Sequence, residues 1–368
     1  MKIPFLSFDS QFEDVREELF DATKKVFNSK WYILGKNLTN FEKNYAKINN
    51  IKYAVGVGSG LDALIISLKS LNITKGDEVI VASNAYIASW LAISNVGATI
   101  IPVEPNPQTF NLDPTKIEEK ITSKTKAIMP VHLYGQPCEM DKIMDIALRN
   151  KLFVVEDNAQ SHLATFNGKP TGTYGNINAT SFYPSKNIGA IGEAGCITTM
   201  DDDLSEFSKT FRNYGSKEKY YCDIIGSNSR LDEIQAAILN VKLKHIQSWN
   251  KERQKIAKRY DQLLSKNLQI TIPYVNPKAQ HVYHLYVIKV DKRDQLQEFL
   301  KEKGIGTSIH YPIPPHLQKA YAHLGYKKGD FPIAEELANT ALSLPVYPGL
   351  KDESIIYICN LINEFFKN

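Results

Sequence analysis

Lys186 lies on a glycine-rich turn between two segments of β-branched and aromatic residues. The surrounding sequence is ATSFYPSKNIGAIGEAGCITT (179–199), and residues 180–183 and 196–199 at its ends are predicted to be strands. A lysine on such a turn is either a solvated loop residue or an amine directed into a cleft. In a cleft, the amine can attack a carbonyl carbon and form a Schiff base. Other parts of the sequence must distinguish these two interpretations.

Two acids end the predicted strand in VVEDNAQSH (154–162). The apolar run stops at Glu156 and Asp157, and the carboxyl ends of strands line the ligand crevice of an open parallel sheet. Asp157 is therefore a candidate ligand contact. Its alternative role is to cap the following helix, which is common for aspartate.

A glycine-rich turn follows the predicted strand in GVGSGLDALIISL (56–68). Gly58, Ser59 and Gly60 lie where the strand turns into a helix. Backbone N–H groups and the helix dipole converge there and favour a phosphate group. The turn lacks the lysine of a Walker motif and the glycine spacing of a dinucleotide site. Its alternative role is purely structural.

These three features match the requirements of pyridoxal 5'-phosphate (PLP). The phosphate of this cofactor needs N–H donors, its pyridine nitrogen needs a carboxylate, and its aldehyde needs an amine. Lys186, Asp157 and the turn at 58–60 are all expected at one edge of one sheet. The combination favours the interpretation of Lys186 as a nucleophile.

Alternating strand and helix signals predict the scaffold that carries these residues. Over the first two thirds of the chain, short helical patterns separate apolar strands. The predicted strands begin at residue 53 and cover 78–82, 98–103, 126–131 and 152–157, with helices over 86–96 and 140–149. This order predicts an α/β fold with a mostly parallel central sheet and helices on both faces.

The last third of the chain indicates a smaller domain. An amphipathic stretch over 230–264 is typical of a helix that bridges two domains. Beyond it the sequence predicts a strand (280–290), a helix (294–305) and a proline-rich extended segment (308–316). We therefore expect a large α/β domain over 1–250 and a small α+β domain over 251–368, with the N-terminal residues packed on the small domain.

The composition excludes several classes of protein. A net charge of +4 over 368 residues is too small for a nucleic-acid-binding surface. Four scattered cysteines without a C-x-x-C pair indicate the reduced thiols of an intracellular protein. Residues 79–103 carry no charge, but asparagine, glycine and proline divide them into strand, helix and strand, so no membrane span is expected. No apolar leader precedes Asp9, and a cytoplasmic location is predicted.

Several motifs together resemble one enzyme family. The strings SFYPSKNIGAIGEAG, VVEDNAQSH, GVGSGLDAL, VHLYGQP and SNSRLDEIQAAIL are similar to those of the DegT/StrS-type nucleotide-sugar aminotransferases, which use PLP and have fold type I. The resemblance runs from IPFL near the start to the C-terminus. The blocks SKWYILG (29–35) and GTSIHYP (306–312) resemble the subgroup that aminates C3 of dTDP-3-oxo-6-deoxyhexoses.

The resemblance implies a role for each matching residue. Lys186 corresponds to the lysine that forms the internal aldimine and later moves the proton, and Asp157 to the acid at the pyridine nitrogen. The other implied cofactor contacts are Ser59 and Gly60 at the phosphate, Ser181 as a hydroxyl donor, Gln160 at the phenolic oxygen and Tyr86 on the ring. The implied substrate contacts are Tyr183, His310 and Tyr311. Asn228 and Arg230 are implied to reach the phosphate in the neighbouring subunit of a homodimer with shared active sites.

The implied reaction moves the amino group of L-glutamate to a nucleotide-linked keto-sugar through pyridoxamine 5'-phosphate. Such reactions supply deoxyamino sugars for lipopolysaccharide O-antigens and S-layer glycans. The alternative acceptor is C4 of a UDP- or dTDP-linked 4-keto-6-deoxy sugar. A PLP-dependent sugar dehydratase is disfavoured, since a histidine replaces the lysine there, and a regulatory protein is disfavoured by the absence of a DNA-binding extension. The sequence predicts no metal site, because no cysteine or acidic pair accompanies the C-terminal histidines.

Overall fold

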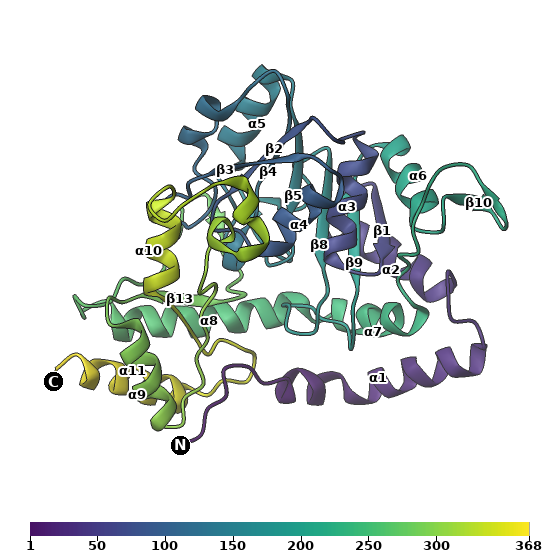
Figure 1. Ribbon diagram of the computed structural model, residues 1–368. Coiled ribbons are helices and arrows are strands. Elements are labelled where there is room, and N and C mark those ends of the chain that lie inside the picture. The colour runs from purple at the N-terminus through teal and green to yellow at the C-terminus, as the bar shows by residue number, and fades with distance from the viewer. Residues whose placement is uncertain (368) are drawn as a thin grey trace.

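The computed structural model describes residues 1–367 and is built around a seven-stranded sheet (Figure 1). Across the sheet the order is β1 (Tyr53–Val57), β9 (Gly195–Thr199), β8 (Ile177–Ser181), β5 (Phe153–Asp157), β4 (Thr125–Met129), β2 (Glu78–Ala82) and β3 (Thr99–Val103). Of these seven strands, β9 runs antiparallel to the other six. The predicted α/β fold with a mostly parallel sheet is confirmed.

Helices cover both faces of the sheet, because successive residues of a strand point to opposite sides. Val55, Val57 and Ile197 pack in one hydrophobic cluster with α3 (Gly60–Ser70). Ala54 and Cys196 pack in another, with α2 (Lys36–Ile48) and α7 (Glu233–Leu243). The alternation in β1 and β9 thus joins the sheet to a helical layer on each side.

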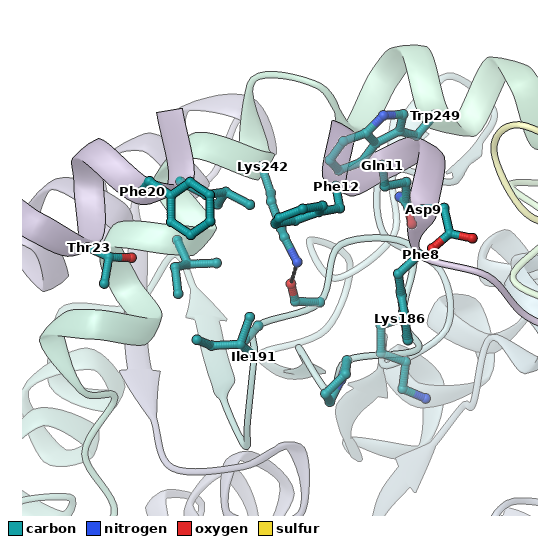
Figure 2. A pocket seen from close by; sticks show the side chains of 15 residues that line it. Phe8, Asp9, Gln11, Phe12, Phe20, Thr23, Lys186, Ile191, Lys242 and Trp249 are labelled. Atoms are coloured by element: carbon teal, nitrogen blue, oxygen red, sulfur yellow. Dashed lines mark hydrogen bonds between the residues drawn. The ribbon is translucent and has the colours of Figure 1, made fainter. Parts of the chain in front are cut away.

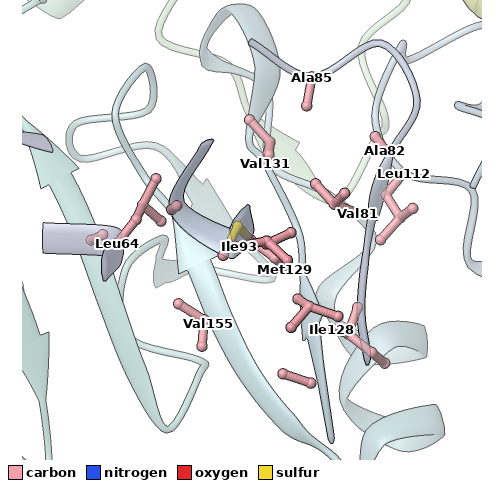
Figure 3. Packing of buried hydrophobic residues seen from close by; sticks show 14 of the residues in the cluster. Leu64, Val81, Ala82, Ala85, Ile93, Leu112, Ile128, Met129, Val131 and Val155 are labelled. Carbon is pink, nitrogen blue, oxygen red and sulfur yellow. The ribbon is translucent and has the colours of Figure 1, made fainter. Parts of the chain in front are cut away.

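The first cluster fills the space between the sheet and the helices α3 and α4 (Ile87–Asn95). Figure 3 shows Leu64 and Ile93 from these helices together with Val155 and Met129 from the sheet. The uncharged segment 79–103 forms most of β2, then α4 and β3, as predicted. No helix within residues 1–367 is long and apolar enough to cross a membrane.

The C-terminal part of the chain has a cluster of its own. β13 (Tyr286–Lys289) pairs antiparallel with β14 (Ala341–Leu344). The helices α8 (Ile246–Leu264), α9 (Arg293–Glu302) and α11 (Asp352–Phe365) contribute to this cluster. Ile3 forms a bridge to Ile305 and belongs to it as well. The predicted domain boundary at residues 250/251 falls within α8 and stays a prediction.

The remaining elements lie around these two cores. α1 (Asp9–Ser29) runs along α7 at the margin of the molecule (Figure 1). The other helices are α5 (Met140–Asn150), α6 (Asp202–Phe211) and α10 (Pro332–Thr340). The short strands are β6 (Thr165–Phe166), β7 (Lys169–Pro170), β10 (Ser216–Glu218), β11 (Tyr221–Cys222) and β12 (Ala279–Gln280).

Two predicted elements are interrupted in the structure. The stretch 230–264 is not one helix, since α7 ends at Leu243 and α8 begins at Ile246. The N–H groups of Lys244 and His245 donate to carbonyls three residues earlier, which tightens the turn between the two helices. The strand predicted over 280–290 is interrupted, because the N–H groups of Val282 and Leu285 bind the loop at 133–135 instead of a neighbouring strand.

Candidate active site

A cavity of about 490 Å³ opens where β5 and β8 end and α3 begins. Its lining includes Ser59, Gly60, Tyr86, Asp157, Gln160, Ser181, Tyr183, Lys186, His310 and Tyr311. The structure therefore brings together the predicted cofactor and substrate contacts, apart from Asn228 and Arg230. These residues come from segments far apart in the sequence, and the ends of the strands and helices collect them at one place.

Asp157 is the last residue of β5, and two hydrogen bonds fix its carboxylate. Oδ1 accepts the backbone N–H of Ala159 at 3.1 Å, and Oδ2 accepts the hydroxyl of Ser89 at 2.8 Å. Ser89 lies on α4, and both side chains are buried. The carboxylate is thus held in one orientation at the cavity. Ser89 was not predicted as a site residue, because its role follows only from the packing of α4 on the sheet.

Glu156, the neighbouring acid, has a structural role. Its carboxylate accepts the Nε2–H of His132 at 2.8 Å and backbone N–H groups of the loop at 172–175. Nε2 is the donor because Nδ1 of His132 accepts the N–H of Cys138. Burial raises the pKa of Glu156, but His132 and the loop N–H groups outweigh it and bring the pKa below its ordinary value. Of these two acids, Asp157 lines the cavity, whereas Glu156 holds the loop at 172–175.

Lys186 lies on the turn after β8, which ends at Ser181 rather than at residue 183. The N–H of Lys186 donates to the carbonyl of Tyr183 at 2.9 Å and closes the turn. Burial lowers the pKa of Lys186 to about 8, against the opposing attraction of the Asp157 carboxylate. A larger fraction of the amine is therefore neutral and nucleophilic at pH 7 than in an ordinary lysine.

The N-terminus of α3 points its free N–H groups at the cavity. Ser59 caps the helix by accepting the N–H of Asp62 at 3.1 Å. Gly60 and Leu61 line the cavity, and N–H groups in a first turn have no carbonyl partner within their helix. A Cβ at Gly60 would lie 2.5 Å from Cβ of Ser181, so this approach of α3 to β8 requires glycine. The site suits an anion such as phosphate.

Tyr86, Gln160 and Tyr311 form one wall of the cavity. The ring centroids of Tyr86 and Tyr311 lie 5.0 Å apart. Nε2 of Gln160 donates to the hydroxyl of Tyr311 at 3.0 Å. Tyr86 and Tyr183 each remain about half exposed. Their rings are therefore accessible to a planar ligand or a sugar.

Two histidines share the cavity with Lys186. Nδ1 of His310 lies 2.8 Å from Oγ of Ser343, and burial, followed by the charge of Lys186, lowers the pKa of His310 to about 4. His284 also lines the cavity, and the same two effects bring its pKa well below the ordinary value. Both imidazoles are therefore neutral at pH 7. His284 was weighed only as a metal ligand and was not predicted at this cavity, because residues 280–290 were interpreted as one regular strand.

Asn228 and Arg230 lie outside the cavity of their own chain. Nδ2 of Asn228 donates to the hydroxyl of Tyr214 at 2.9 Å, and Arg230 donates to Oδ1 of Asn213 at 3.0 Å. The guanidinium of Arg230 lies 5.1 Å from the centre of the Tyr214 ring. Their expected contact is with a neighbouring subunit, and it stays a prediction.

A second hollow, of about 550 Å³, also borders the Lys186 turn (Figure 2). Its lining is largely apolar and includes Phe12, Phe20 and Trp249, and the partly buried amine of Lys242 donates to the carbonyl of Gly189 at 2.6 Å. Lys186 stands at its margin, with the amine directed away from the labelled aromatic side chains (Figure 2). The carboxylate of Asp157 and the N-terminus of α3 line the first cavity, which is therefore the candidate active site.

Comparison with known proteins decides the family. Residues 13–363 match the sequence profile of the DegT/DnrJ/EryC1/StrS aminotransferase family. The chain belongs to this family. The predicted family, its fold and the class of enzyme, an aminotransferase, are thereby confirmed.

Relatives within the DegT/DnrJ/EryC1/StrS family match the chain over nearly its whole length. It is 47% identical to the dTDP-3-amino-3,6-dideoxy-alpha-D-galactopyranose transaminase of Aneurinibacillus thermoaerophilus, with 99% of each chain covered. It is 43% identical to a pleiotropic regulatory protein of Geobacillus stearothermophilus, with 100% of each covered. The solved structure of S. venezuelae DesV in complex with a ketimine intermediate is 42% identical and superimposes with a TM-score of 0.98, covering 100% of this chain and 99% of DesV.

Proposed function

We propose that this family member binds PLP and moves the amino group of L-glutamate to C3 of a dTDP-3-oxo-6-deoxyhexose. One observation carries the proposal: Lys186, an amine with a lowered pKa, shares a cavity with a fixed carboxylate, Asp157, and with the N-terminus of α3. The similarity to a transaminase of a dTDP-3-amino sugar supports the acceptor.

The residues of the cavity fit PLP. The N–H groups at Gly60 and the hydroxyl of Ser181 would hold its phosphate, with Ser59 fixing the helix start. Asp157 would bind the pyridine nitrogen, Gln160 the phenolic oxygen and Tyr86 the face of the ring. When bound, PLP supplies an aldehyde for the amine and a ring that accepts an electron pair from the substrate carbon.

The chain's own residues would move the proton and orient the groups around it. Nζ of Lys186, whose pKa burial lowers to about 8, would move a proton between the substrate carbon and the cofactor carbon in each half of the reaction. Ser89 and Ala159 hold Asp157 in the direction from which it can accept a hydrogen bond from a protonated ring nitrogen. Because the carboxylate is already oriented, it needs no rearrangement as charge develops.

The substrate would enter beside Tyr183, His310 and Tyr311, which line the same cavity. We propose a cytoplasmic homodimer in which Asn228 and Arg230 of one subunit contact the phosphate group in the other. Both side chains lie outside their own cavity, which supports this arrangement.

An absorbance scan of the purified protein with PLP tests the proposal. We expect a band of the bound cofactor that glutamate bleaches and a dTDP-3-oxo sugar restores, whereas a 4-keto sugar leaves it bleached. Lys186→Ala should lack the band. Lys242→Met, which removes the other, partly buried amine with a pKa of about 8, should keep it. A band and turnover that survive Lys186→Ala would contradict the proposal.

A further inference from the structure

Tyr134 has a backbone conformation that L-residues rarely adopt. Its φ is 60°, and Gly135 follows with a φ of 102°. A bulky side chain at positive φ is strained, whereas glycine would adopt the same conformation freely. Strain of this kind persists only where surrounding contacts impose it. The contacts of Tyr134 therefore indicate which interactions hold its backbone in this conformation.

The backbone of Tyr134 orients Gln160. Its N–H donates to Oε1 of Gln160 at 2.6 Å, in a buried position. Because Oε1 is occupied, the Nε2 end of the amide is the end that reaches the hydroxyl of Tyr311 and the cavity. Without the Tyr134 N–H, the amide could rotate by half a turn and present an acceptor where it now presents donors.

The side chain of Tyr134 holds the segment that carries His310 and Tyr311. Its hydroxyl donates to the carbonyl of His310. The buried ring packs edge to face on Phe110, at 6.1 Å between centroids. Its own carbonyl accepts the N–H of Leu285 at 3.2 Å. Tyr134 thus connects Gln160, which follows β5, to the two C-terminal segments that carry His284 and Tyr311.

We propose that Tyr134 is a positioning residue for the transfer reaction: its N–H fixes the donor end of Gln160 toward the cofactor, and its hydroxyl fixes the 310–311 segment toward the sugar. The inference rests on the proposed function, since it concerns the same cavity. Tyr134 does not itself line that cavity, so it acts through Gln160 and through His310 and Tyr311.

The role of the Tyr134 hydroxyl, called here the hydroxyl arm of the proposal, is tested in the cofactor-loaded enzyme with Tyr134→Phe. This change removes the bond to His310 and keeps the backbone bond to Gln160. We expect the KM for the keto-sugar nucleotide to rise about five- to tenfold, as for the loss of one buried hydrogen bond, while the rate of bleaching by glutamate changes less than about twofold. Tyr174→Phe is the matched control, because the Tyr174 hydroxyl also donates to a carbonyl, that of Phe166, away from the cavity.

A double-mutant cycle with Tyr311→Phe separates positioning from general stability. If Tyr134 acts through the 310–311 segment, Tyr311→Phe should raise the KM less in the Tyr134→Phe background than in the wild type. Independent, additive effects would overturn the hydroxyl arm. Equal losses in Tyr134→Phe and Tyr174→Phe would overturn it as well.

The donor end of Gln160, the second arm of the proposal, is tested by Gln160→Glu, whose carboxylate still accepts the Tyr134 N–H but has no N–H to donate. We expect the pH midpoint of the bound-cofactor absorbance to rise by about one unit, because a donor beside the phenolic oxygen becomes a negative charge. An unchanged midpoint would overturn this arm. Absence of the cofactor band in the wild type would instead contradict the proposed function, so the two failures are distinguishable.

Discussion

The amine of Lys186 ionises less readily in the folded protein than in the unfolded chain. Burial lowers its pKa to about 8, whereas an unfolded lysine has a pKa of about 10.4. Below pH 8 both states are protonated, and the folded state bears the cost of the buried charge. Between about 8 and 10.4 the unfolded state binds more protons, so this group makes the free energy of unfolding rise with pH.

Lys186→Met should therefore stabilise the cofactor-free protein most at pH 7, and the gain should shrink toward pH 10. Urea unfolding of both proteins at pH 7, 8, 9 and 10 measures this difference. The methionine alters packing equally at every pH, so only the slope of the difference reports the ionisation. A difference that stays constant over this range would show that the amine is not desolvated in the folded state.

The single residues that sequence could predict are those with distinctive chemistry at the end of an element. Lys186 and Asp157 are of this kind, and the structure places both at one cavity. Ser89 and Tyr134 were not predicted, because a serine on a helix and a tyrosine before a glycine are common. Their partners, Asp157 and Gln160, lie 68 and 26 residues away. Only the folded chain brings these pairs together.

At the scale of elements, the approach of α3 to β8 shapes the anion-binding end of the cavity. Gly60→Ala would place a Cβ 2.5 Å from Cβ and 3.0 Å from Cα of Ser181, so helix and strand must separate. We expect a loss of about 1–3 kcal/mol in the free energy of unfolding, as for other overpacked sites. Cofactor affinity should fall at least about tenfold, because the N–H groups and the Ser181 hydroxyl no longer converge.

Gly192→Ala provides the matched control for this change. An added Cβ there would meet only the end of the flexible Gln235 side chain, at 3.1 Å. Chemical unfolding and a fluorescence titration with PLP compare the two variants. If Gly60→Ala bound the cofactor as tightly as Gly192→Ala, the phosphate would not lie between α3 and Ser181.

Element boundaries were predictable where the local pattern itself changes. Asn95 and Gly97 mark the end of α4, and the predicted helix there agrees with Ile87–Asn95. The break between α7 and α8 has no proline or glycine, and the apolar stripe continues through it. At the break, Nζ of Lys244 forms an ion pair with Oε2 of Glu18 in α1, at 2.6 Å. Because these two residues lie more than two hundred positions apart, the local spacing of apolar residues does not predict their contact.

At the scale of the whole molecule, a single chain exposes apolar side chains near the residues expected to reach a partner. Tyr220, in the turn of the projecting β10–β11 hairpin, is 86% exposed, and Ile225, shortly after the hairpin, is 96% exposed (Figure 1). Exposed apolar side chains grouped in this way are typical of interaction surfaces. The hairpin is followed directly by the segment that carries Asn228 and Arg230. These observations support the proposed homodimer.

Shared active sites make a quantitative prediction for mixed dimers. Lys186→Ala and Arg230→Ala should each be nearly inactive alone. After random mixing in equal amounts, half of the dimers are mixed, and each mixed dimer has one site with both native residues. About a quarter of wild-type activity should therefore return. If Arg230 acted in its own chain's cavity, every site of a mixed dimer would lack one residue, and unfolding and refolding the two variants together would restore no activity.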